Sequence, residues 1–304
     1  MSDSITPVSI DAFGQSDVGL VRGNNEDSFL MADLTTGATA SDVFALNHTI
    51  GDKGGLLLVA DGMGGAEAGE VASRMAAHEV ARALIDQLSN QRSVDQRPFV
   101  KALKHSVQEA NHMVFDESQQ NSHLKGMGTT LTAAAVHGRF IFFAQLGDSR
   151  AYLARNGFIT QMTQDQSLVA QLVASGSLSP QEAKTHPQRN VILQALGVQR
   201  QVDAVVSFAE LKSGDQVVLC SDGLSGKVDE EEIKEFLDRR LEPKAICQHL
   251  IDLARERGGE DNITVIVAGF DGEGLSWPDP GEAPVYNRFK EERRRRFWPW
   301  GRRQ

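Results

Sequence analysis

Four short acidic segments contain the residues best suited to chemistry, and each adjoins an apolar run. They are Arg22–Asp27, Asp61–Gly65, Ser221–Gly223 and Glu260–Asn262. A carboxylate at the end of a strand is held by rigid backbone, and several carboxylates that converge bind hard divalent cations through oxygen. A single Asp-Gly pair is more typical of an ordinary turn. Only the set of four therefore predicts a divalent metal site.

The glycines of Gly62–Gly65 allow a second interpretation, a loop that cradles the phosphates of a nucleotide. That fingerprint requires a third glycine where Glu67 stands, and it would place the Asp61 carboxylate against phosphate. A metal ion between the two groups removes the conflict. The sequence therefore favours a metal site.

The elements that must position these segments alternate between β and α patterns. Apolar runs typical of strands cover residues 8–13, 27–32, 55–60, 129–136, 139–146, 151–154, 158–162, 215–220 and 262–268. Helical spacing predicts helices that begin near residues 66, 95, 229 and 242. Asn156-Gly157 is a strong hairpin signal, whereas residues 33–53 have weak periodicity and are predicted to form a surface loop.

An insert over residues 167–201 changes to a helical pattern. Ser179 and Glu182 have the spacing of a capping box, with Pro180 at the first helical position. We expect this insert to lie beside the sheet.

The composition is that of a folded protein, with 304 residues, 40% hydrophobic and 24% charged. The longest apolar runs, 56–60 and 140–144, are far too short to cross a bilayer, and the first residues show no signal-peptide pattern. Cys220 and Cys247 are the only cysteines, so a disulfide framework is excluded and reduced core thiols are expected. These features predict a cytoplasmic protein.

Charge is distributed unevenly along the chain. Residues 288–304 carry a net charge of plus six, and residues 1–287 carry minus sixteen, which should repel nucleic acid. The tail could bind an anionic membrane surface at the inner face of the membrane, or dock on the acidic body, or remain a free solubilising tail. The residues that would do so are Arg293, Arg294, Arg295, Arg296, Trp298 and Trp300.

Six motifs in order resemble those of the PP2C (PPM) family of metal-dependent serine/threonine protein phosphatases, in its bacterial form. They are Ser16–Asp27, Asp61–Gly65, Gly126–Thr130, Gly147–Tyr152, Ser221–Leu224 and Asp261–Asn262. The resemblance implies an α+β fold: a four-layer α-β-β-α sandwich of two antiparallel sheets, flanked by helix pairs. Residues 1–270 would form the phosphatase domain, with a flap at about 167–201. Residues 271–304 would be a linker and a basic-aromatic tail.

The same resemblance implies how two Mn²⁺ or Mg²⁺ ions would be held. Asp61 would bridge both ions and the Gly62 carbonyl would complete the first site. Asp222 and Asp261 would hold the second ion. Aspartates that supply a third site in the family are replaced by Lys125 and Gly226, so a third ion should be weak or absent.

The implied reaction is hydrolysis of phosphoserine and phosphothreonine on proteins, which would oppose a bacterial Ser/Thr kinase. A hydroxide shared by two cations would attack phosphorus. Arg22 would bind the phosphate, and Glu26 and Asp27 would bind waters on the metals. Asp148 is interpreted as structural, bonded to backbone at its turn.

Two other functions fit part of this pattern. A non-catalytic phosphoprotein-binding module on the same fold would be indicated by loss of a metal ligand, but Asp61, Asp222 and Asp261 are all present. A hydrolase of small phosphate esters or nucleotides would need an aromatic pocket for the base, which the sequence does not indicate.

Overall fold

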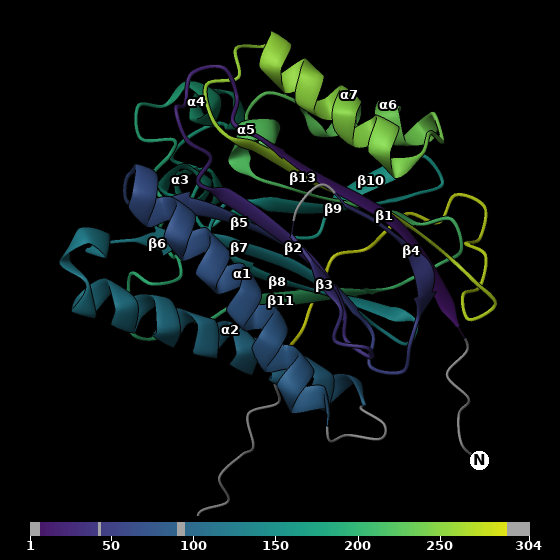
Figure 1. Cartoon of the computed structure of the whole chain (residues 1–304). Helices are drawn as coiled ribbons and strands as arrows, with labels where there is room; N and C mark the ends of the chain where they lie inside the picture. Colours follow the sequence, from purple (N-terminus) through teal and green to yellow (C-terminus); the bar gives the residue numbers. More distant parts are fainter. Residues whose placement is uncertain (1–6, 42–43, 90–94, 291–304) are drawn as a thin grey trace, which may run out of the picture.

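In the computed structural model, which describes residues 7–41, 44–89 and 95–290, the chain forms two antiparallel sheets with helices outside them (Figure 1). The six-stranded sheet has the order β10 (Phe158–Gln161), β9 (Arg150–Arg155), β12 (Gln216–Cys220), β13 (Ile263–Asp271), β1 (Val8–Asp17) and β4 (Phe44–Ile50). The eight-stranded sheet has the order β14 (Asn287–Arg288), β11 (Val205–Glu210), β8 (Phe140–Leu146), β7 (Leu131–His137), β5 (Gly55–Met63), β2 (Asp27–Asp33) and β3 (Thr39–Ala40), with β6 (Gly128–Thr129) paired to β5.

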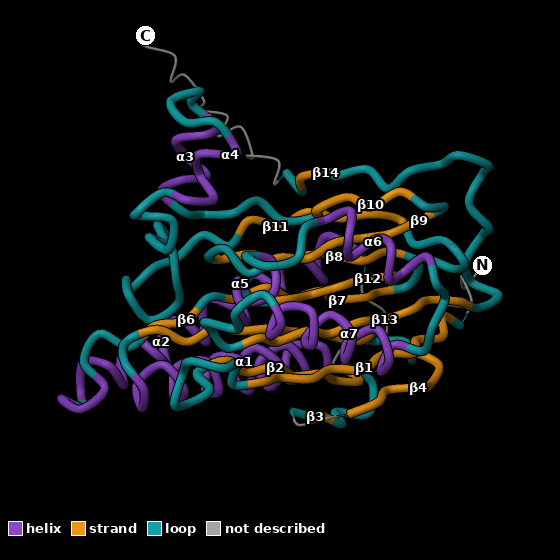
Figure 2. Tube along the Cα trace, turned by 90° about the horizontal axis from the view of Figure 1, so that it is seen from above, coloured by secondary structure: helices purple, strands orange, loops and turns teal. Residues whose placement is uncertain are grey.

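Helices cover the outer face of each sheet. The long pair α1 (Ala66–Ser89) and α2 (Gln96–Gln120) packs on the eight-stranded sheet, and a short 3₁₀ turn follows at Ser122–Leu124. The six-stranded sheet is covered by α5 (Asp222–Ser225), α6 (Glu230–Asp238) and α7 (Pro243–Glu256). Helices α3 (Leu168–Ala174) and α4 (Pro180–Thr185), in the 167–201 insert, project from the sandwich, as the view from above shows (Figure 2).

Three apolar cores separate the four layers and confirm the predicted architecture. One lies between α1, α2 and the eight-stranded sheet, one between the two sheets, and one beneath α5, α6 and α7. Strand β5 shows why the 55–60 run is continuously apolar. Leu56 and Leu58 face the α1 side while Leu57 and Val59 face the other sheet, so both faces are buried.

Local signals that depend on near neighbours are confirmed. Asn156 and Gly157 both have positive φ, 53° and 76°, as a tight hairpin turn requires. Ser179 and Glu182 form the expected capping box at the start of α4. Cys220 and Cys247 are buried free thiols.

Three segments differ from expectation. Residues 33–53 are not only a loop, because β4 pairs with β1 from Phe44 to Ile50 at the edge of the six-stranded sheet. Its apolar residues do not alternate with polar ones, so the strand pattern is missing. Strand β11 was not expected. Residues 186–201 are not helical, because Leu196 bonds Thr129 by backbone and Asn111 holds Gly197 through its side chain.

The predicted linker after residue 270 also differs, since residues 272–290, the C-terminal segment, pack along the sandwich. Glu282 accepts a hydrogen bond from the buried Arg155 at 2.8 Å, and Arg155 also binds Asp215. Phe289 lies 6.1 Å from Phe208, ring centre to ring centre. The described residues after 270 therefore pack with the sandwich and do not form a free linker.

The basic-aromatic tail, including Arg293–Arg296, Trp298 and Trp300, lies outside the described residues. Within the described ranges, no helix has the length and apolar character needed to span a membrane.

We predict that a chain ending at residue 270 is less stable than one ending at residue 290. It would lose the Arg155–Glu282 ion pair, the β11–β14 pairing and the packing of Phe289. Each lost kcal/mol lowers the melting temperature of a domain of this size by about 2–4 °C, so a drop of several degrees is expected. Thermal unfolding of the two truncated chains measures it, and equal melting temperatures would contradict the role of the segment.

Candidate metal centre

The predicted carboxylates converge at one end of the sandwich. Asp27 begins β2 and stands opposite Asp61 in the β2–β5 register. Asp222 follows β12 at the start of α5, and Asp261 lies two residues before the start of β13, the neighbour of β12. The ends of both sheets therefore bring together residues nearly two hundred positions apart.

Two threonines of the Gly126–Thr130 motif hold Asp61 in place. The backbone N–H of Asp61 donates to Thr130 Oγ1 at 2.9 Å, and its carbonyl accepts from Thr130 N at 2.8 Å and from Thr129 Oγ1 at 2.9 Å. The Thr130 hydroxyl also bonds Ser149 at 2.8 Å. This motif and the Gly147–Tyr152 motif therefore brace the strand end that carries Asp61.

Only glycine fits at position 62. Its N–H donates to the Glu26 carbonyl at 3.1 Å, and a side chain there would collide with the carbonyls of Glu26 and Gly69. The close approach of β5 to α1 fixes the Gly62 backbone beside Asp61.

Asp27 joins the two sheets. Its buried carboxylate accepts hydrogen bonds from the Ser221 and Thr264 hydroxyls, both at 2.7 Å. Burial raises the pKa of Asp27 to about 7, although these two hydrogen bonds oppose the rise. Sequence reasoning missed Thr264 as a partner, because nothing local to it indicates a contact with residue 27.

Burial and like charge make this cluster electrostatically strained. Burial, with added repulsion from Asp27 and Asp222, raises the pKa of Asp61 well above its usual range. The pKa of Asp222 is raised by burial and by Asp261, and that of Glu26 is raised chiefly by burial. Crowded carboxylates of this kind are relieved by protons or by a cation.

Arg22 supplies one positive charge. Its guanidinium donates to Asp261 Oδ2 at 2.8 Å, and its side chain remains 48% exposed. Because about half of the side chain is exposed, N–H groups of the guanidinium that do not bond Asp261 are open to solvent, where a phosphate could reach them. The structure thus brings the predicted phosphate-binding residue into contact with a predicted metal ligand.

Asp148 accepts a hydrogen bond from its own backbone N–H, as expected for a structural role at its turn. Its Oδ1 is buried and has no hydrogen-bond partner, although Gln145, Gln166 and Ser149 bond the neighbouring backbone and hydroxyl groups of the turn. Burial, followed by repulsion from Asp222 and Asp165, raises the pKa of Asp148 to about 7. Oδ1 of Asp148 is therefore an unsatisfied acceptor beside the cluster.

The donors fit divalent cations in chemical type. They are hard oxygens from Asp61, Asp222 and Asp261, with the Gly62 carbonyl beside them. In the ranges that the structure covers, no three His, Cys, Asp or Glu side chains are grouped closely enough to form a ready metal cage. A hydrogen bond joins the side chains of Asp61 and Asp222, and Asp261 is paired with Arg22 instead.

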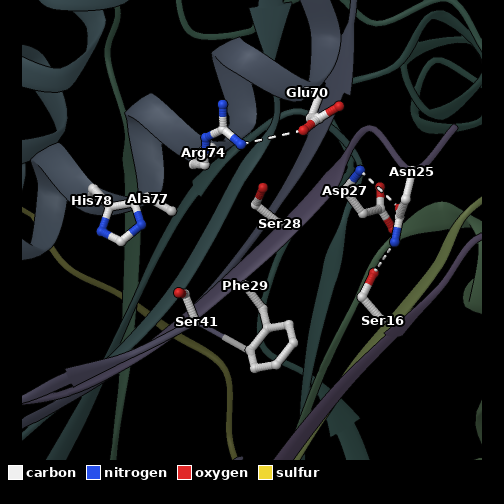
Figure 3. Close-up of a pocket in the computed structure, with 10 residues that line it drawn as sticks. All are labelled: Ser16, Asn25, Asp27, Ser28, Phe29, Ser41, Glu70, Arg74, Ala77 and His78. Carbon is white, nitrogen blue, oxygen red and sulfur yellow. Dashed lines mark hydrogen bonds and ion pairs between the residues drawn. The ribbon is translucent and has the colours of Figure 1, made fainter. Parts of the chain in front are cut away.

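A pocket of about 350 Å³ adjoins the cluster on the α1 side (Figure 3). Asp27 and Asn25 line one wall, and Glu70 and Arg74, paired at 3.2 Å, line another. Its lining does not include Asp61, Asp222 or Asp261. The pocket therefore lies beside the carboxylate cluster.

Comparison with known proteins identifies the family. Residues 32–254 match the family model described as protein phosphatase 2C. The chain is 35% identical over 254 residues to the serine/threonine phosphatase stp of Listeria innocua, covering 83% of this chain and 93% of that protein. The chain belongs to the protein phosphatase 2C family, as the six motifs predicted.

Two further similarities involve PstP. The chain is 38% identical over 254 residues to the serine/threonine protein phosphatase PstP of Mycobacterium tuberculosis, covering 84% of this chain but only 44% of that protein. The structure of the catalytic domain of PstP in complex with two manganese ions is 36% identical. It matches with a TM-score of 0.70 and covers 87% of this chain and 99% of that chain.

We predict that the metal-free protein loses stability as pH rises from about 4 to about 7. Folding raises the pKa of Asp27 and of Asp148 from the ordinary 3.8 to about 7. Between these pH values the folded state binds protons more tightly than the unfolded state, so stability is present at low pH and is lost as pH rises. With a chelator present to keep the protein metal-free, Asp148→Asn should raise the melting temperature at pH 8 and change it little at pH 4. Exposed Asp203→Asn is the control. A melting temperature independent of pH, or an equal gain in the control, would count against this electrostatic account.

Proposed function

We propose that this protein is a metal-dependent phosphatase that hydrolyses phosphoserine and phosphothreonine on proteins. The observation that carries the proposal is the convergence of Arg22 with Asp61, Asp222 and Asp261 at one end of a protein phosphatase 2C fold. The relatives are named serine/threonine phosphatases, and the solved structure of PstP has a similar fold. Both similarities support the proposed substrate class.

Each residue of the site has a role in the proposed reaction. Asp61, the Gly62 carbonyl, Asp222 and Asp261 would hold two Mn²⁺ or Mg²⁺ ions. Such ions would supply the positive charge that activates water as the nucleophile and neutralises the phosphoryl oxygens.

The remaining residues bind substrate and orient solvent. Arg22 would release part of its contact with Asp261 and donate to phosphate oxygens, for which its planar fork is suited. Glu26 and Asp27 would accept hydrogen bonds from waters in the site. Asp27 keeps its orientation through Ser221 and Thr264.

The partner we propose is a phosphorylated protein, including a Ser/Thr kinase whose action the enzyme would reverse. A non-catalytic binding module on this fold is the alternative. The test is release of phosphate from a phosphothreonine peptide with Mn²⁺, compared with phosphotyrosine peptide and nucleotides. Preference for nucleotides, or no release with any metal, would contradict the proposal.

We predict that Asp61→Asn or Asp222→Ala lowers kcat by at least about a hundredfold, since each removes a ligand from the cations that generate the nucleophile. The metal-free variants should be as stable as the wild type or more so, because a repulsive charge is gone. Phosphopeptide turnover and thermal unfolding measure both effects, with Asp203→Asn as the control. Near wild-type turnover in either variant would mean that the metal ligands are misassigned.

A separate prediction concerns Arg22→Ala. Loss of a charge-assisted hydrogen bond to phosphate should raise KM by about tenfold or more, with a smaller effect on kcat. Arg22→Lys should restore only part of the affinity, because lysine lacks the bidentate geometry. Arg82→Ala, an exposed arginine on α1, is the matched control. An unchanged KM in Arg22→Ala would remove this residue from the phosphate site.

A further inference from the structure

One buried side chain, that of Asn262, bonds both ends of the exposed loop that carries Arg22. Residues 18–26, here called the Arg22 loop, connect β1 to β2, and Leu20–Asn24 within it are exposed to solvent. An exposed loop does not by itself fix a guanidinium within hydrogen-bond distance of Asp261. Some contact must anchor it.

Asn262 makes three hydrogen bonds to the backbone of this loop. Its Oδ1 accepts from Glu26 N at 2.8 Å, and its Nδ2 donates to the carbonyls of Val18 at 2.9 Å and Asn24 at 3.0 Å. One amide therefore ties together both ends of the Arg22 loop. The donors and acceptors permit only one orientation of the amide, because the N–H of Glu26 needs an acceptor and the two carbonyls need donors.

The same residue also orients Asp261. The backbone N–H of Asn262 donates to Asp261 Oδ1 at 2.9 Å, while Arg22 donates to Asp261 Oδ2 at 2.8 Å. Asn262 is only 4% exposed, so its hydrogen bonds are shielded from water. Gly259, three residues earlier in the chain, adds a second contact, since its carbonyl accepts a hydrogen bond from Leu20 N at 2.7 Å.

We propose that Asn262 is a positioning residue for Arg22. Its side chain sets the conformation of the Arg22 loop, and its backbone sets the carboxylate against which the guanidinium rests. Asn262 touches neither phosphate nor metal in this proposal. It acts by keeping Arg22 at one place, so that little ordering remains when phosphate binds.

Two substitutions separate this role from general stability. Asn262→Ala removes the amide, whereas Asn262→Asp keeps the volume and the acceptor oxygen but loses both N–H donors. The matched control is Asn156→Asp at the β9–β10 turn. There too the side-chain N–H groups donate to two carbonyls, those of Asp279 at 2.9 Å and Glu282 at 3.3 Å.

The first measurement does not depend on activity. Hydrogen–deuterium exchange of the backbone amides of residues 18–26 in the full chain should accelerate by about tenfold or more in both Asn262 variants. Exchange in this loop should be unchanged in Asn156→Asp. Unaltered exchange in a folded Asn262→Asp would overturn the proposal, and this variant decides it if Asn262→Ala does not fold.

The second measurement is kinetic and rests on the proposed function. With a phosphothreonine peptide and saturating Mn²⁺, Asn262→Asp should raise KM by about tenfold with a smaller change in kcat. Added to Arg22→Ala, it should cause little further loss, because both changes remove the same function. If the fold-increases in KM of the two single variants multiply in the double variant, the positioning role is overturned.

The two measurements also separate two failures. If the wild-type chain releases no phosphate, the proposed function fails, while the exchange measurement still decides whether Asn262 fixes the Arg22 loop.

Discussion

Negative charge crowded into one end of a β-sandwich is the constraint on which the rest of the structure depends. Asp27, Asp61 and Asp222 are buried enough to lose hydration, which, with mutual repulsion, raises the pKa of each. Such a cluster persists only where rigid neighbours hold it and a cation or proton relieves it. The strand ends provide the rigidity. The same charges that cost stability would attract divalent cations, so metal occupancy should affect stability and turnover together.

The site is also the place where the two sheets are joined. Asp27, from the eight-stranded sheet, accepts hydrogen bonds from Ser221 and Thr264, which adjoin or belong to the six-stranded sheet. Asn262 ties the Arg22 loop to the start of β13 in the same region. The hydrogen bonds that orient the functional groups are therefore among those that hold the sandwich together. Separating the two roles requires variants that keep shape while removing single donors.

Elements that rely on distant partners were the hardest to predict. Strand β4 gains its place by pairing with β1, and its sequence does not alternate apolar and polar residues as a strand with one buried face does. The C-terminal segment has the composition of a linker, yet Glu282 binds the buried Arg155 and Phe289 packs against Phe208. In both cases the stabilising contact comes from residues at least thirty positions away. A local pattern contains no record of such a contact.

The sequence by itself determined the family, through six motifs in order, and with the family the expected layered fold and the candidate metal ligands. It also determined the hairpin at Asn156-Gly157, because turn chemistry is a property of neighbouring residues. Only the tertiary structure decided how those aspartates are used. It placed Asp27 opposite Asp61, paired Arg22 with Asp261, left Oδ1 of Asp148 without a hydrogen-bond partner and bonded Asn262 to both ends of the Arg22 loop. The physical reason is that hydrogen bonds and repulsion depend on distances of a few ångströms in space. Folding creates those distances between residues such as Arg22 and Asp261, which are 239 positions apart in the chain.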